Sequence, residues 1–148
     1  MIEKNLMAAV AAAAFCISGL AHAALGGTVE SVQADKSAMH AKAQVLPGAG
    51  SYSVHEIQLP STTVVREYVS TEGRVFAIAW EGPSLPDIRQ LLGGYFDRFA
   101  GAMGKRRAQR HAVVSQPDLV IQSHGRMGAF SGRAYLPQAL PQGVGADV

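Results

Sequence analysis

His55 and Glu67 are the two residues whose types and spacing best suit acid–base chemistry. They flank the turn-forming segment Pro60-Ser61-Thr62, and the stretches on either side are rich in β-branched and aromatic residues. This pattern predicts a β-hairpin with residues 60–62 as its loop. In that register His55 lies opposite Glu67 beside an apolar patch, where burial and a close partner would shift both pKa values.

The same register allows a purely structural role. It pairs Glu56 with Arg66 on the other face of the hairpin. A cross-strand ionisable pair can simply hold two strands in register, and we favour this interpretation of His55 and Glu67. If Glu72-Gly73 forms the next turn, the residues expected to join the His55 face are Phe76, Ile78 and Trp80.

Candidate binding residues come from the same predicted strands and from a strand near the C-terminus. The arginines could hold an anionic group, and the aromatic side chains could present a binding surface. The candidates are Trp80, Tyr68, Arg66 and Arg133.

A basic cluster follows the predicted main helix. Its members are Lys105, Arg106, Arg107 and Arg110. Cations at a helix C-terminus complement the helix dipole, so a solvated helix end explains the cluster. The functional alternative is contact with anionic material of the cell envelope, such as lipid headgroups or a phosphorylated polymer.

Other motifs are incomplete. His55-Glu56 begins like a zinc-protease motif, but Leu59 stands where the second histidine is required. Ser131 and His124 lack the strand–turn–helix setting of a nucleophile elbow. No two of the histidines after residue 23 have local metal-ligand spacing, so we expect no metal site and no cofactor. These histidines are His40, His55, His111 and His124.

The elements that must position these residues follow from hydrophobic periodicity. We predict a weak N-terminal helix over residues 31–42 and one main amphipathic helix over residues 86–103. Strands are predicted over residues 51–59, 63–70, 74–81, 118–123 and 128–136. The expected fold is α+β: an antiparallel sheet of about five strands, with both helices packed on one face. A tail from about residue 137 should be extended.

The N-terminus is typical of a cleaved signal peptide. Lys4 precedes an apolar run over residues 6–20, and Ala21-His22-Ala23 has the small-x-small pattern of a cleavage site. We place the cut after Ala23, which removes the only cysteine, Cys16. Residues 24–148 then form a single cysteine-free domain without a transmembrane segment, exported to the periplasm or secreted.

The composition excludes two function classes. The chain has 148 residues, 48% of them hydrophobic and 16% charged, which is typical of a globular protein and not of a disordered one. Its net charge of +2 is too small to attract nucleic acid over long range. We therefore expect no nucleic-acid partner.

Several segments together resemble a known bacterial family, domain of unknown function 2844. They include residues 54–57, residues 63–70 and the stretch Ala79-Trp80-Glu81-Gly82-Pro83. Residues 87–96 and 129–137 are also similar to it. The resemblance implies a short exported protein with one domain, and it implies no activity and no site residues.

We thus expect an exported, non-catalytic binding or interaction module of the cell envelope. Its partner would be an envelope protein, a polymer or a small ligand. The alternative is a small periplasmic enzyme that uses His55 and Glu67 as an acid–base pair.

Overall fold

The computed structural model describes residues 25–48, 50–104 and 111–147. The predicted signal peptide, residues 1–23, lies outside the described residues, as does the basic cluster Lys105, Arg106, Arg107 and Arg110. The elements in chain order are α1 (Val29–Ala38), β1 (Lys42–Leu46), β2 (Tyr52–Gln58), β3 (Val64–Ser70), β4 (Val75–Gly82), α2 (Ile88–Leu92), η1 (Gly93–Tyr95), α3 (Phe96–Gly104), β5 (His111–Gln116), β6 (Leu119–Arg126), β7 (Ala129–Tyr135) and η2 (Pro137–Ala139).

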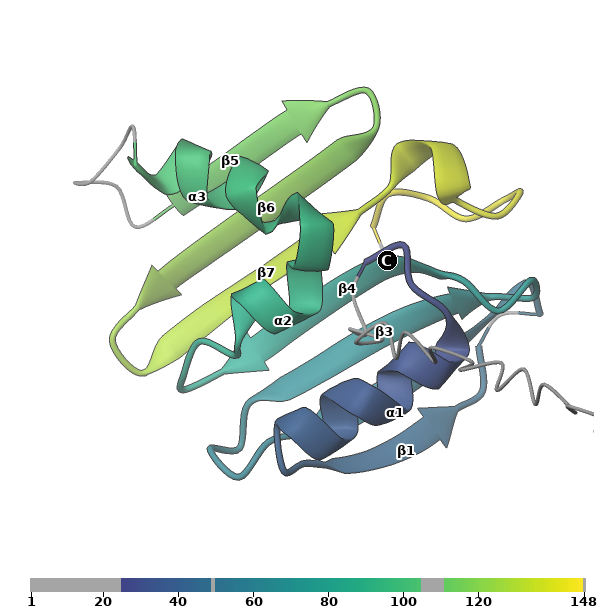
Figure 1. Cartoon of the computed structure of the whole chain (residues 1–148), viewed down its shortest axis with the longest axis horizontal. Coiled ribbons are helices and arrows are strands. Elements are labelled where there is room, and N and C mark those ends of the chain that lie inside the picture. Colours follow the sequence, from purple (N-terminus) through teal and green to yellow (C-terminus); the bar gives the residue numbers. More distant parts are fainter. Residues whose placement is uncertain (1–24, 49, 105–110, 148) are drawn as a thin grey trace, which may run out of the picture.

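One antiparallel sheet of seven strands dominates the fold (Figure 1). Its strand order is β1-β2-β3-β4-β7-β6-β5, so two meanders meet where β4 pairs with β7. The predicted α+β fold with about five strands is therefore wrong. The described chain is mostly a seven-stranded sheet, and its helix content is small.

The two unpredicted strands, β1 and β5, are the edges of the sheet. β1 contains Lys42, Ala43 and Gln44, which are poor strand formers, and most of its residues are exposed. The helix expected over residues 31–42 instead ends at Ala38, and His40 has a left-handed φ of 50° that does not continue a helix. β5 follows directly on the basic cluster and is short. Its alternation of exposed and buried residues was therefore not recognised as a strand pattern in the sequence.

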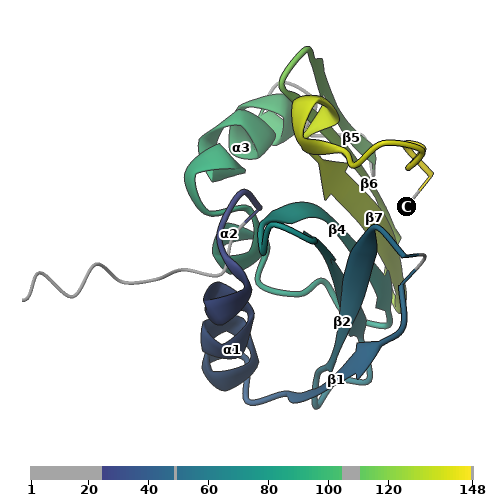
Figure 2. The ribbon, with the colours of Figure 1, turned by 90° about the vertical axis from the view of Figure 1, so that its right-hand side faces the viewer.

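The helix predicted over residues 86–103 is interrupted. α2 ends at Leu92, a 3₁₀ turn spans Gly93–Tyr95, and α3 starts at Phe96. Gly93 has φ +51°, a left-handed conformation that a regular helix excludes and that glycine adopts readily. Figure 2 shows that α1, α2 and α3 all lie on the same side of the sheet.

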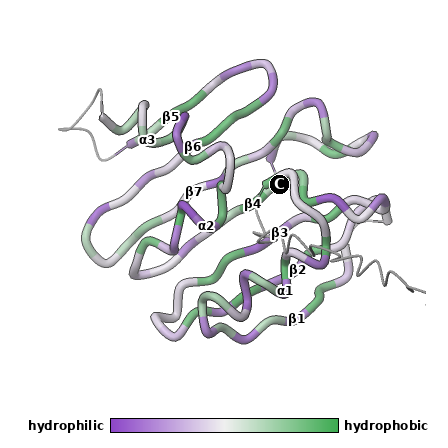
Figure 3. The backbone as a smooth tube through the Cα atoms, viewed as in Figure 1, coloured by the Kyte–Doolittle hydropathy of each residue, from purple (hydrophilic) through white to green (hydrophobic). Residues whose placement is uncertain are grey.

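The core lies between these helices and the sheet. Successive side chains of a strand point to opposite faces of the sheet, so one side chain in two points toward this core. Figure 3 shows the hydrophobic residues distributed along the strands and helices. Fully burying each large aliphatic or aromatic side chain stabilises the fold by roughly 1.5–3 kcal/mol. The least exposed large hydrophobic residues of this core are Val32, Ile57, Val65, Ile78, Leu91, Leu92, Leu119 and Ile121.

Phe76 does not join this core, contrary to the sequence prediction. The β3–β4 register shifts between Tyr68 and Val69, which is the signature of a β-bulge. Phe76 consequently packs against Tyr52 and Tyr68, with ring centroids 5.8 and 6.3 Å away. Ile78 and Trp80 lie on the His55 face as predicted.

The last part of the C-terminal tail lies on the other side of the sheet from the helices (Figure 2). It begins with the 3₁₀ turn η2, and residues near its end line a hollow together with Tyr52 and Tyr68. In the described part of the chain, every helix is too short or too polar to cross a membrane.

Candidate functional site

Arg66 and Arg133 flank a shallow hollow on the open face of the sheet. Arg66 on β3 lies opposite Ala79 on β4, and Ala79 lies opposite Arg133 on β7. Because the alanine side chain between them is short, a hollow of about 310 Å³ opens there. Its other lining residues are Trp80, Glu81, Gln122, His124, Ser131, Gly132 and Asp147.

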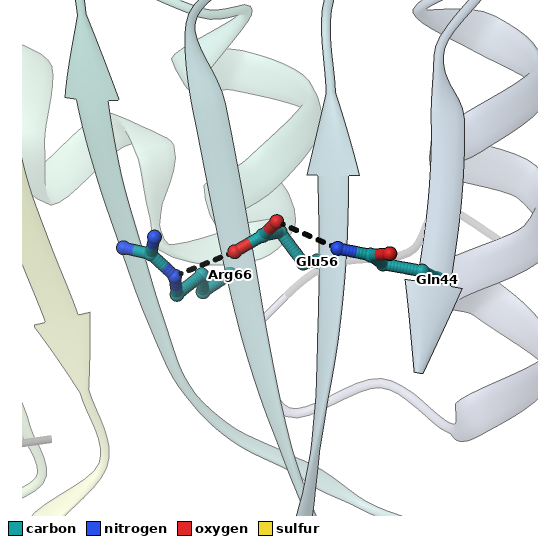
Figure 4. A network of polar contacts seen from close by, with 3 residues as sticks. All are labelled: Gln44, Glu56 and Arg66. Atoms are coloured by element: carbon teal, nitrogen blue, oxygen red, sulfur yellow. Dashed lines mark hydrogen bonds and ion pairs between the residues drawn. The ribbon is translucent and has the colours of Figure 1, made fainter. Parts of the chain in front are cut away.

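A polar network orients Arg66 (Figure 4). Its Nε donates to Oε2 of Glu56 at 3.0 Å, and Oε1 of Glu56 accepts a hydrogen bond from Nε2 of Gln44 at 3.0 Å. The Glu56–Arg66 pair expected from the hairpin register is thus confirmed. The network spans three strands, with an exposed Gln44 and a part-buried Arg66–Glu56 bond, and it holds the guanidinium plane beside the hollow.

Arg133 is held in the same way from the other side. Its Nε donates to Oε1 of Gln122 on β6 at 3.0 Å. A guanidinium group has five N–H donors, so anchoring through Nε leaves the two Nη groups available to a ligand. The site therefore presents two oriented guanidinium forks from strands on either side of Ala79.

Acidic groups border the same hollow. Glu81 and Asp147 both line it, and Asp147 belongs to the C-terminal tail. The tail also lines a second hollow of about 350 Å³ beside Tyr52 and Tyr68, so Asp147 borders both. The site consequently offers guanidinium donors and carboxylate acceptors within one surface.

The four binding candidates from the sequence lie near one another. Arg66, Arg133 and Trp80 line the first hollow, and Tyr68 lines the second. The side chain of Trp80, however, belongs to the core, with only 2% of the residue exposed. It therefore cannot present a stacking surface, whereas Tyr68 is half-buried and its ring packs 5.9 Å from that of Tyr52.

His55 and Glu67 are directly opposite one another, as the register predicts. Both lie on the helix-covered face, where His55 is 9% and Glu67 1% exposed. Nε2 of His55 is 3.3 Å from the Ser53 hydroxyl. Glu67 contacts Asp35 of α1. The two residues are brought together in register, but their side chains have other partners.

Burial governs the protonation of this region. It lowers the pKa of His55, because desolvation disfavours the imidazolium. It also raises the pKa of Glu67 to about 9, with further contributions from a hydrogen bond to Asp35 and from its charge. Glu67 is therefore a neutral carboxylic acid at pH 7. A substrate could not reach it without displacement of α1.

Asp35 is the polar core residue that sequence reasoning missed. It is fully buried, and its Oδ1 accepts a hydrogen bond of 2.6 Å from Nε2 of Gln90 in α2. Asp35 lies three residues after Val32 and therefore on the same, apolar side of α1. This spacing is the sequence feature that could have predicted its burial. Asp35, Glu67 and Gln90 link α1, β3 and α2.

Ser131 and His124 are cross-strand neighbours on β7 and β6. Within the described ranges the two side chains form no hydrogen bond with each other, and Nδ1 of His124 instead lies 2.7 Å from Nδ1 of His111. The geometry gives no sign of a serine activated by a histidine base.

A family model for "Protein of unknown function (DUF2844)" matches residues 21–148. It covers all of the described strands and helices and confirms the resemblance seen in the sequence. No curated protein and no solved structure matches the chain.

Proposed function

The chain belongs to the DUF2844 family, and we propose that it is a non-catalytic binding module of the cell envelope that holds an anionic group between Arg66 and Arg133. The observation that carries this proposal is the pair of guanidinium groups flanking Ala79, each anchored through Nε. Anchored forks of this kind suit carboxylate and phosphate groups, which accept two parallel N–H bonds.

The acidic lining restricts the ligand further. Glu81 and Asp147 would repel a polyanion such as a nucleic acid or a polyphosphate chain. They suit a ligand that carries an amine or hydroxyl donor close to its anionic group. The ligand class proposed is therefore a zwitterion or a short peptide-like segment with a free carboxylate.

We favour the binding role over a His55–Glu67 enzyme, because a ligand from solvent can reach the arginine hollow but not the buried His55 and Glu67. Arg66 alternates along β3 with the buried Val65 and Glu67, so the arginine hollow lies on the face away from the core, whereas His55 and Glu67 are buried on the core face. General acid–base catalysis requires contact with the proton that is transferred.

Export is the second part of the proposal, and it rests on the signal-peptide pattern of residues 1–23. The test is Edman or mass-spectrometric sequencing of the N-terminus of protein purified from a periplasmic extract. A start at Ala24 supports export with cleavage. An intact N-terminus on cytoplasmic protein would contradict it.

Ligand binding can be tested by following the Nε–H NMR signals of the arginines. We would titrate the protein with two probes, inorganic phosphate and the zwitterionic dipeptide alanyl-alanine. Both should shift the signals of Arg66 and Arg133, with the dipeptide more effective. Arg66→Lys, which keeps the charge but loses the fork, should weaken binding by about ten-fold, as expected for loss of a bidentate contact.

The matched control is Arg89→Gln, because Arg89 lies on α2 on the other side of the sheet. It should leave both titrations unchanged. The proposal fails if neither probe shifts the two signals at millimolar concentration, or if Arg89→Gln weakens binding as much as Arg66→Lys.

A further inference from the structure

His111 and His124 form a second cluster of functional groups on the open face. They are directly opposite one another on β5 and β6, and both are exposed. Their Nδ1 atoms are 2.7 Å apart, and their rings are 4.8 Å apart between centroids with a tilt of 62°. The Nδ1 atoms of the two imidazole rings therefore face each other.

A hollow of about 320 Å³ opens beside this pair. Ser131 and Arg126 are among its lining residues, and the hollow is accessible from the surface. The pair is therefore open to an ion from solvent, unlike the buried His55.

Metal ligation fits this geometry. A metal bound to two imidazole nitrogens at about 2.0–2.1 Å each, at angles between about 90° and 109°, separates those nitrogens by about 2.9–3.3 Å. The observed 2.7 Å requires the two exposed rings to open by only a few tenths of an ångström. A neutral imidazole that carries its proton on Nε2 leaves Nδ1 free to ligate, so a change of tautomer is sufficient.

We propose that His111 and His124 form a binding site for a divalent transition metal ion that prefers imidazole, with Cu²⁺ bound more tightly than Ni²⁺ or Zn²⁺. The order follows from the general affinity series for nitrogen ligands. Among the described residues, no group of three or more His, Cys, Asp or Glu side chains is placed to hold a metal ion, so the two histidines would be the main protein ligands. Water or the Ser131 hydroxyl would complete the coordination.

The histidine site does not depend on the arginine site, although His124 and Ser131 border both hollows. Arg126 lines the histidine hollow, and its charge opposes a cation there. Removing that charge should therefore tighten metal binding, which a purely structural histidine pair does not predict.

The test is calorimetric titration of the protein, purified without a polyhistidine tag, with CuCl₂, NiCl₂ and ZnCl₂. We expect one site for Cu²⁺ with two nitrogen ligands in its electron paramagnetic resonance spectrum. His111→Ala and His124→Ala should each weaken Cu²⁺ binding by about ten-fold or more, the scale on which metal-site groups act. Arg126→Gln should tighten it.

His40→Asn is the matched control, since His40 is exposed and lies before β1, and asparagine tolerates its positive φ. It should leave Cu²⁺ binding unchanged. Circular dichroism on each variant separates loss of ligands from loss of fold. The inference is overturned if correctly folded His111→Ala and His124→Ala proteins bind Cu²⁺ as tightly as the parent, or if His40→Asn removes the site.

Discussion

Asp35 of α1 contacts Glu67 of β3, and both residues are buried, with 0% of Asp35 and 1% of Glu67 exposed. Two carboxyl groups can form a hydrogen bond only when one of them is protonated. Burial and the neighbouring Asp35 raise the pKa of Glu67 to about 9, so Glu67 carries a proton at neutral pH. The close approach of α1 to the sheet therefore depends on a proton, which avoids placing two buried negative charges side by side.

The first prediction is that stability falls as this proton is lost. The pKa of Glu67 is 4.5 in the unfolded chain, its ordinary value, and about 9 in the folded chain. Unfolding between these values releases a proton, so the free energy of unfolding decreases with rising pH, by at most about 1.4 kcal/mol per pH unit. Glu67→Gln, which keeps a donor toward Asp35, should remove this decrease.

Urea unfolding between pH 7 and pH 9 measures the effect, because this range lies between the pKa values of Glu67 in the unfolded and folded chain, and burial lowers the pKa of His55 away from it. Glu72→Gln is the control, since Glu72 is exposed in the β3–β4 turn and should keep the slope of the parent. A parent protein whose stability does not change over this range, or a Glu67→Gln variant with the same slope, would contradict this dependence on a proton.

The second prediction concerns the close contact between Trp80 and Gly132. A Cβ atom on Gly132 would lie 2.3 Å from Cζ2 of Trp80 and 2.7 Å from the carbonyl oxygen of Gln122. Gly132→Ala must therefore displace the indole from the core or distort β7. We expect a loss of about 1–3 kcal/mol, the usual cost of overpacking, measured by urea unfolding together with Trp80 fluorescence.

Gly128→Ser tests whether this cost is specific to the packing. Gly128 has open space around it but a positive φ of 79°, so its substitution strains the backbone without touching the core. The Trp80 fluorescence of the folded Gly128→Ser variant should match that of the parent. An unchanged stability and emission maximum in Gly132→Ala would show that the indole does not lie against this glycine.

The sequence predicted the local part of this architecture and missed the non-local part. The Pro60-Ser61-Thr62 loop correctly set the register that places His55 opposite Glu67. The β4–β7 pairing has no local pattern, because the two strands are separated by the helices and two further strands. That pairing places Arg133 across Ala79 from Arg66, so no spacing rule could have identified the arginine site.

The contact between α1 and the sheet illustrates the same limit. A buried carboxylate is unfavourable unless it is neutralised or hydrogen-bonded, and a helix pattern does not show which strand residue will meet it. The sequence pattern distinguishes Glu67 only through its cross-strand neighbour His55. Its charge state is instead set by burial and by Asp35, which is 32 positions away in the chain and comes from a different element.

The third prediction separates orientation from stability at the arginine site. Glu56→Ala removes the acceptor that holds Arg66 at 3.0 Å, in an ion pair that is partly exposed. Such pairs contribute about 0–1 kcal/mol, so unfolding should change little. Binding of alanyl-alanine should weaken several-fold, because the guanidinium is no longer held beside the hollow.

NMR titration of Glu56→Ala, with its stability measured in parallel, distinguishes these effects. Glu72→Ala again serves as the exposed control. Equal affinity in the parent and Glu56→Ala would show that the Gln44–Glu56–Arg66 network has no part in positioning Arg66 for a ligand.

The last prediction uses the adjacent glycines that interrupt the main helix. Gly93 caps α2 with a left-handed φ of +51°, whereas Gly94 does not have a positive φ, and a Cβ atom added to it would meet no other atom within 4 Å. Gly93 combines φ +51° with ψ −122°, and holding alanine in such a sparsely populated region costs about 1–3 kcal/mol. Gly93→Ala should therefore destabilise the protein by about that amount in urea unfolding. Gly94→Ala should be neutral or stabilising by up to about 1 kcal/mol, because it reduces the entropy of the unfolded chain. If both substitutions stabilised the protein equally, the interruption between α2 and α3 would not be required, and a continuous helix over residues 86–103 would again be the better description.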